Sequence, residues 1–293
     1  KHRIGAVQGL IDNIDDDGFV QAKIQGFTNT LRFKHAVCVN LPSDRKPYGK
    51  ELRALFTVRK DTHTLCGSDM ASLEDRTKQH YMWDYDPEYV TAMTTKGFDP
   101  HLDLALSAGA VTQEQVDEYK SGNKTDEVTQ LRHNYKGGNY ACTYGAGVNT
   151  LSKQLGINEA EATKIHKAYW ERNWSLKAIA KDTEVKIVNE KMWLWNPVSE
   201  LYYFLKADKD KFSTLNQGTG TYCFDMWLAF IVRKREQLTA QFHDEVILEL
   251  QENKQEQVTA ILKESIQNVN KLLKLNRDLD CDISFGKDYS QIH

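Results

Sequence analysis

The sequence predicts an α+β fold, because strand-like patterns occur towards both ends of the chain and helical patterns fill its middle. Short β-like runs bounded by turn residues mark the two ends. Apolar residues at three- and four-residue spacing mark the segment from about 85 to 212. The 293 residues, 40% of them hydrophobic, suffice for one large domain or two moderate ones.

The first part of the chain predicts short strands before a helix. Residues 1 to about 42 alternate β-like runs with turn signals such as DDDG at 15–18. A turn-rich link at 43–50 leads into a short helical pattern, ELRALF. Residues 64–68 then predict a strand that leads directly into Asp69, with a helix behind it in ASLEDRTKQHYM.

The middle of the chain predicts an inserted helical lobe. Helix starts are expected at Thr112, Thr125 and Asn158. Asn158 precedes Glu161 by three residues, which is the spacing of a capping box.

The last part predicts a buried helix over 215–235, where FDMWLAFIV is apolar nearly all round. The segment LTAQFHDEVILEL predicts a hairpin with His243 and Asp244 at its tip. Helical spacing then recurs from Val258 to Leu273, and LDCDISFG predicts a final strand.

Charge and cysteine content narrow the classes of protein. A formal net charge of -3 requires that any DNA-binding surface concentrate its positive charge on one face. Five cysteines without a CxxC pair favour neither disulfides nor a zinc site, so we expect a reduced, intracellular compartment. No apolar run approaches the roughly 20 residues of a membrane span, so we expect a cytoplasmic protein with no membrane partner.

Asp69 and Asp244 are candidate metal ligands, since each is expected at a strand end or a hairpin tip. Magnesium binds oxygen ligands and is often held by one or two carboxylates together with substrate phosphates. If the two aspartates converge, they can hold two ions roughly 3.5 to 4 Å apart. The alternative is that each is an ordinary solvated turn residue.

A cationic and aromatic series follows in the helical lobe. Arg132, Lys136, Tyr140 and Tyr144 recur every four residues, so each step drifts only about 40° around a helix and all four share one flank. Charge for phosphates and rings for sugar and base would suit a nucleotide. An amphipathic helix with inward tyrosines is the alternative. The pair Gly137–Gly138 costs a helix roughly 2 kcal/mol, which suggests close approach of a ligand or a hinge.

Three segments resemble the motifs of family A DNA polymerases. RHNYKGGNYACTYG resembles motif B, RxxxKxxx(F/Y)xxxYG, while DMASLEDR at 69–76 resembles motif A and HDE at 243–245 resembles motif C. Their order and separations are those of the family. Smaller matches resemble replicative polymerases of short-tailed bacteriophages: RIG, TLRFKHA, RKPYGKELRALF, DPH, NQGTG and GKDYSQIH. The last of these resembles the family's GxNWxxxH ending, so His293 is expected to be the C-terminus, whereas the initial lysine suggests a fragment or a processed chain.

The resemblance implies a right-hand polymerase fold. An antiparallel-sheet palm would occupy 1–84 and 213–293, and mainly helical fingers would occupy 85–212; neither a thumb nor an exonuclease is seen in this chain. The implied function is template-directed DNA synthesis in phage replication, in the host cytoplasm, by transfer from a dNTP to a primer 3′ hydroxyl. The implied partners are primer-template DNA and dNTPs, with a processivity factor or a separate thumb or exonuclease subunit left open.

The resemblance also implies roles for individual residues. Two Mg²⁺ ions would be held by Asp69, Asp244 and the carbonyl of Met70. The triphosphate would be held by Arg132, Lys136 and His101, with Lys136 also protonating pyrophosphate. Tyr140 and Tyr144 would bracket the sugar and the templating position, and Glu74 would exclude a 2′ hydroxyl. Contacts to the primer end would come from Arg32, Gln217 and His243, and Glu245 would be an auxiliary carboxylate.

Two departures from the family pattern concern DNA contacts. The TGR element of relatives is TLR here, which affects the expected position of Arg32, and Ser213 replaces an asparagine expected in the minor groove. The alternatives are a single-subunit RNA polymerase and a noncatalytic DNA-binding remnant. Glu74, and HDE rather than HDS, favour deoxynucleotides over the first; retention of both aspartates and Lys136 disfavours the second.

Overall fold

The computed structural model describes residues 2–38, 41–44, 46–234 and 237–292, with the backbone alone for His2, Arg3 and Ala6. It divides into two compact units, each with its own apolar core. Unit 1 comprises Lys1–Thr77, Asn196–Tyr203 and Gln217–His293, and unit 2 comprises Lys78–Trp195 and Phe204–Asn216. The expected C-terminal residue, His293, lies outside the described residues. Helices combined with antiparallel sheets confirm the α+β prediction.

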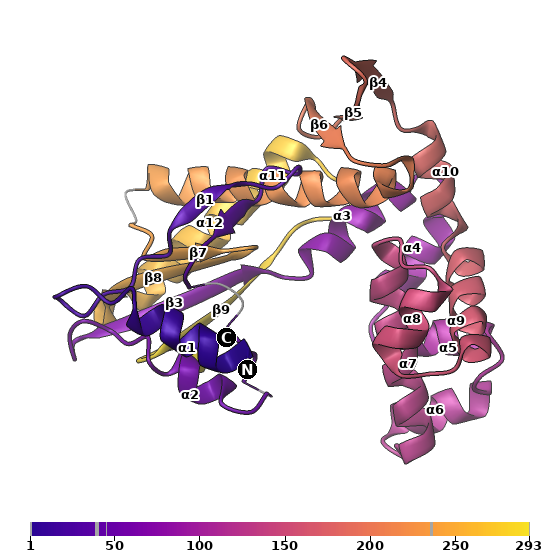
Figure 1. Ribbon diagram of the computed structural model, residues 1–293, viewed down its shortest axis with the longest axis horizontal. Helices are drawn as coiled ribbons and strands as arrows, with labels where there is room; N and C mark the ends of the chain where they lie inside the picture. The colour runs from indigo at the N-terminus through magenta and orange to yellow at the C-terminus, as the bar shows by residue number, and fades with distance from the viewer. Residues whose placement is uncertain (1, 39–40, 45, 235–236, 293) are drawn as a thin grey trace. The chain divides into compact units, whose positions relative to one another are not determined.

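Unit 1 is built on a four-stranded antiparallel sheet in the order β7-β8-β3-β9. These strands are β7 (Ala240–Phe242), β8 (Glu245–Gln251), β3 (His63–Met70) and β9 (Cys281–Gly286). Alternate residues point to opposite faces, so the central strands β3 and β8 contribute to two cores. Two long helices, α11 (Lys211–Arg233) and α12 (Gln255–Leu273), cover one face (Figure 1). Trp227 of α11 is fully buried there.

The opposite face of the sheet carries a smaller core. Leu65 of β3 and Ile247 of β8 pack against Tyr289 and Ile292, from the segment that follows β9. Helix α2 (Gly49–Arg53) contacts the same segment. The remaining elements of this part are α1 (His2–Ile11), the two-stranded ribbon of β1 (Ile24–Phe27) and β2 (Phe33–His35), and α3 (Leu73–Met82), which follows β3.

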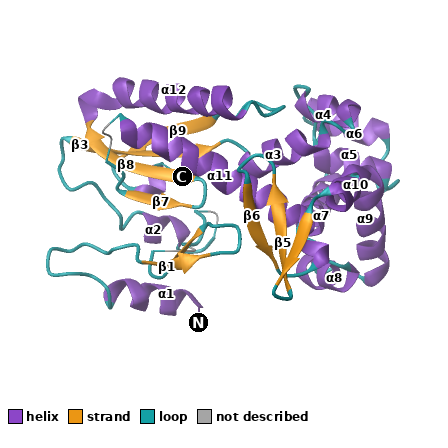
Figure 2. Cartoon of the chain, turned by 90° about the horizontal axis from the view of Figure 1, so that it is seen from above, coloured by secondary structure: helices purple, strands orange, loops and turns teal. Residues whose placement is uncertain are grey.

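Unit 2 is mainly helical (Figure 2). Its helices are α4 (Pro87–Thr94), α5 (Pro100–Ser107), α6 (Gln113–Ser121), α7 (Asp126–Thr143), α8 (Val148–Leu155), α9 (Glu159–Arg172) and α10 (Trp174–Asp182). Helix α7 contacts α5, α8 and α9. Among the residues described in the whole chain, no helix is both long and apolar enough to cross a membrane.

All three predicted helix starts in unit 2 are N-caps. The side chains of Thr112, Thr125 and Asn158 each accept a hydrogen bond from the backbone N–H three residues later. The reciprocal capping box forms at Thr112, whose backbone N–H donates to Gln115 Oε1 at 2.8 Å.

One local prediction was wrong. Residues 2–11 form α1 rather than strands, because Ile4, Val7 and Ile11 recur at helical spacing. The region predicted to be mainly helical is so, and it also contains a three-stranded sheet of β4 (Val185–Val188), β5 (Lys191–Asn196) and β6 (Leu201–Leu205). Asn189 and Glu190, with φ of 48° and 60°, form the two-residue turn between β4 and β5.

Helix packing gives a reason for the glycine pair in α7. A Cβ atom on Gly137 would collide with Cδ2 of Leu155, which ends α8, and one on Gly138 would collide with Cγ2 of Ile165 in α9. The two glycines therefore let neighbouring helices approach α7 closely. This explanation needs neither a ligand nor a hinge.

The two glycines should respond differently to alanine. Alanine gains roughly 1 kcal/mol of helix propensity at either position. At Gly137 the colliding atom is the flexible tip of a leucine, whereas at Gly138 it is the branch of a β-branched side chain that cannot turn away. Overpacking costs about 1 to 3 kcal/mol. We therefore expect Gly138→Ala to lower the free energy of unfolding in urea by about 1 to 2 kcal/mol and Gly137→Ala to change it by less than about 0.5 kcal/mol. Equal effects would contradict this packing account.

Candidate functional site

Three acidic side chains form a row across the sheet of unit 1. Asp69 on β3 is paired in register with Glu245 on β8 and with Asp282 on β9. Directly opposed residues of antiparallel strands project to the same face, with Cβ atoms about 4.5 to 5.5 Å apart. The strand predicted to lead into Asp69 runs on through Met70, so Asp69 is held by ladders on both sides.

The hairpin tip adds the fourth carboxylate. Phe242 pairs with Glu245, which leaves His243 and Asp244 as the two-residue connection that the sequence predicted. His243 has φ 53°, the left-handed conformation such turns require. The backbone N–H of Met70 donates to the Asp244 carbonyl at 3.0 Å, so the ladder fixes Asp244 next to the end of β3.

Sequence reasoning missed Asp282. It lies in the predicted final strand, but nothing local distinguishes it from a solvated strand residue. Period-2 alternation places it on the face opposite to Cys281, which is buried in the α11–α12 core. Only the register with β3 identifies it as a neighbour of Asp69.

The electrostatics of this acidic row favour a cation. Burial raises the pKa of Asp69, and Asp282, Asp244 and Glu245 raise it further by repulsion. No group of three or more His, Cys, Asp or Glu among the described residues is arranged as a ready-made metal cage. The row offers only carboxylate oxygens, and these do not form a complete coordination shell by themselves. Such a donor set fits Mg²⁺, which keeps several water ligands and also binds substrate phosphates.

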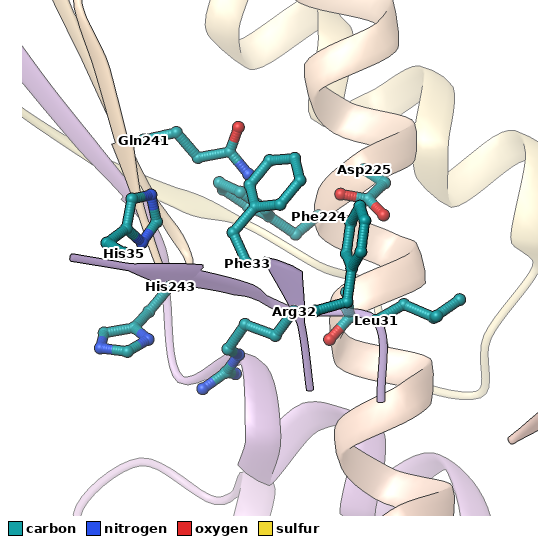
Figure 3. Close-up of a pocket in the computed structure, with 10 residues that line it drawn as sticks. Leu31, Arg32, Phe33, His35, Phe224, Asp225, Gln241 and His243 are labelled. Atoms are coloured by element: carbon teal, nitrogen blue, oxygen red, sulfur yellow. The ribbon is translucent and has the colours of Figure 1, made fainter. Parts of the chain in front are cut away.

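A pocket in unit 1 gathers two of the three predicted DNA contacts (Figure 3). Arg32, between β1 and β2, and His243, at the hairpin tip, extend to the same side of the ribbon. The aromatic side chains that line this pocket are Phe27, Phe33 and Phe224. Gln217 on α11 is not among its described lining residues, although Thr221 one turn later is.

Two further titratable groups line the same pocket. Burial raises the pKa of Asp225 to about 6, so its charge changes close to neutral pH. Burial lowers the pKa of His35, and the nearby His243 lowers it further. Apolar walls with a few polar groups are typical of small-molecule and nucleotide sites.

Arg32 and Glu74 are close to each other. Arg32 Nη2 lies 3.6 Å from Glu74 Oε1, in the first turn of α3. Leu31, at the position where the family pattern TGR predicted glycine, has φ 64°. The left-handed conformation costs a leucine roughly 1 to 2 kcal/mol, so the TLR departure keeps the backbone of a glycine at the expense of strain.

The predicted cationic and aromatic residues of unit 2 lie on α7 and at its end. Lys136 and Tyr140 are exposed on the helix, and Tyr144, also exposed, is its C-cap. Arg132 Nε donates to Asp99 Oδ2 at 2.6 Å, and Arg132 helps to hold the pKa of Asp99 below its usual value against the opposing effect of burial. Asp99 also N-caps α5 by accepting from the backbone N–H groups of His101 and Leu102.

His101 lies against the same flank of α7. Its Nδ1 is 3.3 Å from Asn139 Nδ2, and its ring centroid is 5.8 Å from that of Tyr140. The structure therefore brings Arg132, His101 and Tyr140 together within unit 2. Asn139, which contacts His101, and Asp99, which accepts from Arg132, carried no predicted role.

Comparisons with known proteins agree on one family. Residues 2–196 match the family described as DNA polymerase family A. DNA polymerase I of Lactococcus lactis subsp. cremoris is 23% identical over 303 residues, covering 97% of this chain and 32% of that protein. A DNA-directed DNA polymerase of Escherichia phage Phieco32 is 45% identical over 56 residues, 19% of this chain and 9% of that protein.

A solved structure shares the fold. The POL domain of Pol1 from M. smegmatis, in complex with DNA primer-template and dNTP, has a TM-score of 0.76 at 20% identity, over 99% of this chain and 51% of that chain. The expected polymerase fold is confirmed by this likeness. The chain spans about a third of the Lactococcus relative and about half of the solved chain.

Asp69→Asn should stabilise the fold at alkaline pH. The folded chain raises the pKa of Asp69. The repulsion between Asp69 and its neighbouring carboxylates is therefore absent below the ordinary pKa of Asp69, where the group is protonated, and it destabilises the fold increasingly as pH rises through the raised pKa. Asp69 is exposed, so solvent screens much of this repulsion. We expect the melting temperature in EDTA to exceed that of wild type by about 1 to 3 °C at pH 8 and by less at pH 5.

The control for this measurement is Asp16→Asn, which removes an exposed carboxylate from the DDDG turn. Added Mg²⁺ should narrow the difference at pH 8 by binding wild type. A variant that melts below wild type at pH 8, or a gap that widens at pH 5, contradicts the repulsion.

Proposed function

The chain belongs to DNA polymerase family A, and from that premise we propose that it adds deoxynucleotides from dNTPs to the 3′ hydroxyl of a primer, directed by a template. The observation that carries the proposal is the strand register, which holds Asp69 and Asp244 at adjoining ends of β3 and the β7–β8 hairpin. The M. smegmatis POL domain, solved with primer-template and dNTP, supports these partners.

Family A DNA polymerases use divalent metal ions, and we propose Mg²⁺ for this chain. Asp69, Asp244 and the Met70 carbonyl would supply the protein oxygens. Two bound ions would activate the attacking hydroxyl and stabilise the leaving oxygen. The repulsion among the unneutralised carboxylates supports this role, because a cation would relieve it.

We propose that α7 supplies the nucleotide's counter-charges. Lys136 and Arg132 would hold the triphosphate with His101, and Lys136 would donate a proton to the departing pyrophosphate. Arg132 forms an ion pair with Asp99, so a bound phosphate would either share the Arg132 guanidinium with Asp99 or displace Asp99 from it. Tyr140 and Tyr144, both exposed, would stack on sugar or base.

The two units would then correspond to palm and fingers, unit 1 and unit 2 respectively. In unit 1, Arg32 and His243 would contact the primer end in the aromatic pocket, and Gln217 would contact DNA from α11. Glu245 would serve as the auxiliary carboxylate. The short phage match supports a role in phage replication in a host cytoplasm, and a processivity factor or a separate exonuclease or thumb subunit would be further partners.

Two other functions are distinguishable by experiment. An RNA polymerase would prefer rNTPs on the same primed template, and a noncatalytic remnant would bind primed DNA without nucleotide-dependent metal uptake. Isothermal titration of Mg²⁺ and dNTP into the complex with primed DNA, beside primer extension, separates all three.

Removing either aspartate should abolish extension. Two-metal chemistry needs both ligands, so Asp69→Ala and Asp244→Ala should each reduce the single-turnover rate more than 100-fold, about 2.7 kcal/mol. Binding of primed DNA should stay within about two-fold by fluorescence anisotropy, and Asp16→Ala is the matched control. Retention of more than about 1% of the rate by either variant counts against the metal assignment.

Glu74 should exclude ribonucleotides by size. Glu74→Ala opens space beside the sugar's 2′ carbon and should raise the rNTP to dNTP ratio of kcat/KM on the order of 10-fold, about 1.4 kcal/mol. Glu74→Gln keeps the bulk but loses the charge facing Arg32, so it should leave the ratio nearly unchanged. If this ratio rises in both variants, the effect is due to the ion pair with Arg32. If it rises in neither, Glu74 does not exclude ribonucleotides.

A further inference from the structure

The Glu245 carboxylate accepts a hydrogen bond from a buried side chain that has no role in the proposed reaction. Tyr289 Oη donates to Glu245 Oε2 at 2.8 Å. Only 5% of Glu245 and 7% of Tyr289 is exposed, although Asp69, with which Glu245 pairs, is open to solvent. A carboxylate taken out of water in this way needs hydrogen bonds or a nearby positive charge.

Arg53 supplies a buried positive charge beside the tyrosine. Its guanidinium lies 4.9 Å from the centre of the Tyr289 ring, and the residue is 5% exposed. Its Nε donates to the Pro42 carbonyl at 2.9 Å, whereas Nη1 has no hydrogen-bond partner among the described residues. Tyr289 therefore contacts both charged groups, since its ring packs against the Arg53 guanidinium and its hydroxyl donates to the Glu245 carboxylate.

Close packing fixes this arrangement against the sheet. A Cβ on Gly67, two residues before Asp69 in β3, would lie 2.7 Å from the Ile292 carbonyl oxygen. The glycine therefore lets the segment of Tyr289 reach the face of the sheet that carries Asp69 and Glu245. The Tyr289 ring also packs edge-on against Phe56, with centroids 6.5 Å apart. Tyr289 has little freedom to choose another acceptor.

We propose that Arg53 and Tyr289 are positioning residues for the metal site: they hold the Glu245 carboxylate in one orientation beside Asp69 and Asp244. This inference rests on the proposed function. The Tyr289 hydroxyl fixes one oxygen of Glu245 by its hydrogen bond. The positive charge of Arg53 offsets part of the negative charge that the four neighbouring carboxylates create. Burial and Glu245 both raise the pKa of Tyr289, which keeps the hydroxyl a donor at neutral pH.

Tyr289→Phe tests the proposal, because it removes the hydroxyl and keeps the ring beneath Arg53. The direct readout is Mn²⁺ affinity of the whole chain, measured by electron paramagnetic resonance with MnCl₂ alone. We expect about 3- to 10-fold weaker binding. Extension should need correspondingly more Mg²⁺ for its half-maximal rate, while KM for dNTP changes less than two-fold.

Tyr85→Phe is the matched control. Tyr85 Oη donates to Asp182 Oδ2 at the same distance, 2.8 Å, but both residues belong to unit 2, whereas the acidic row belongs to unit 1. It should leave Mn²⁺ affinity unchanged. Wild-type Mn²⁺ affinity and Mg²⁺ dependence in folded Tyr289→Phe would overturn the proposal.

If Tyr289→Phe fails to fold, a second pair of variants still tests the proposal. Glu245→Gln should weaken Mn²⁺ binding to a similar degree, and Arg53→Lys, which keeps the charge but not the planar stacking group, should do so less. Unchanged Mn²⁺ affinity in both variants overturns the positioning role of Arg53 and Tyr289. Asp69→Asn distinguishes failure of this inference from failure of the proposed function. If Asp69→Asn leaves Mn²⁺ binding intact, the metal site itself is wrong. If it abolishes binding, the metal site stands, and the variants at Tyr289, Glu245 and Arg53 test only the positioning of Glu245.

Discussion

The antiparallel pairing of β3 with β8 and β9 is the constraint on which the candidate site depends. It places Glu245, Asp69 and Asp282 in one row and holds Asp244 at the adjoining turn. A slip of one residue in either pairing would send its partner carboxylate to the opposite face, where Trp227 and the α11–α12 core are packed. The hydrophobic pattern that fixes the fold therefore also fixes the acidic row.

This arrangement carries an electrostatic cost. Burial and then the neighbouring carboxylates raise the pKa of Asp69, and the buried Glu245 carboxylate adds a desolvation cost of its own. Local strain adds to it, since Leu31 and His243 both adopt left-handed backbone conformations beside the pocket. Such costs are typical of sites whose geometry serves a ligand, and the surrounding cores must offset them.

Sequence patterns succeeded where the signal is local. N-caps at Thr112, Thr125 and Asn158 and the two-residue tip at His243 and Asp244 depend on hydrogen bonds within a few residues. The strand prediction for residues 2–11 was wrong because the apolar spacing of this segment fits a helix. The sequence suggested a ligand or a hinge for the glycine pair in α7, because its packing partners Leu155 and Ile165 belong to other helices and no local pattern reveals them.

The sequence by itself determined the α+β class, most element positions, and the residue types of a polymerase-like site, with Asp69, Asp244 and Lys136 in their motifs. Tertiary structure alone decided which distant groups meet: Asp282 with Asp69, Tyr289 with Glu245, and Asp99 with Arg132. The reason is physical. Periodicity and capping are encoded within one or two turns of chain, whereas strand register and side-chain partners emerge only when segments far apart in sequence pack together.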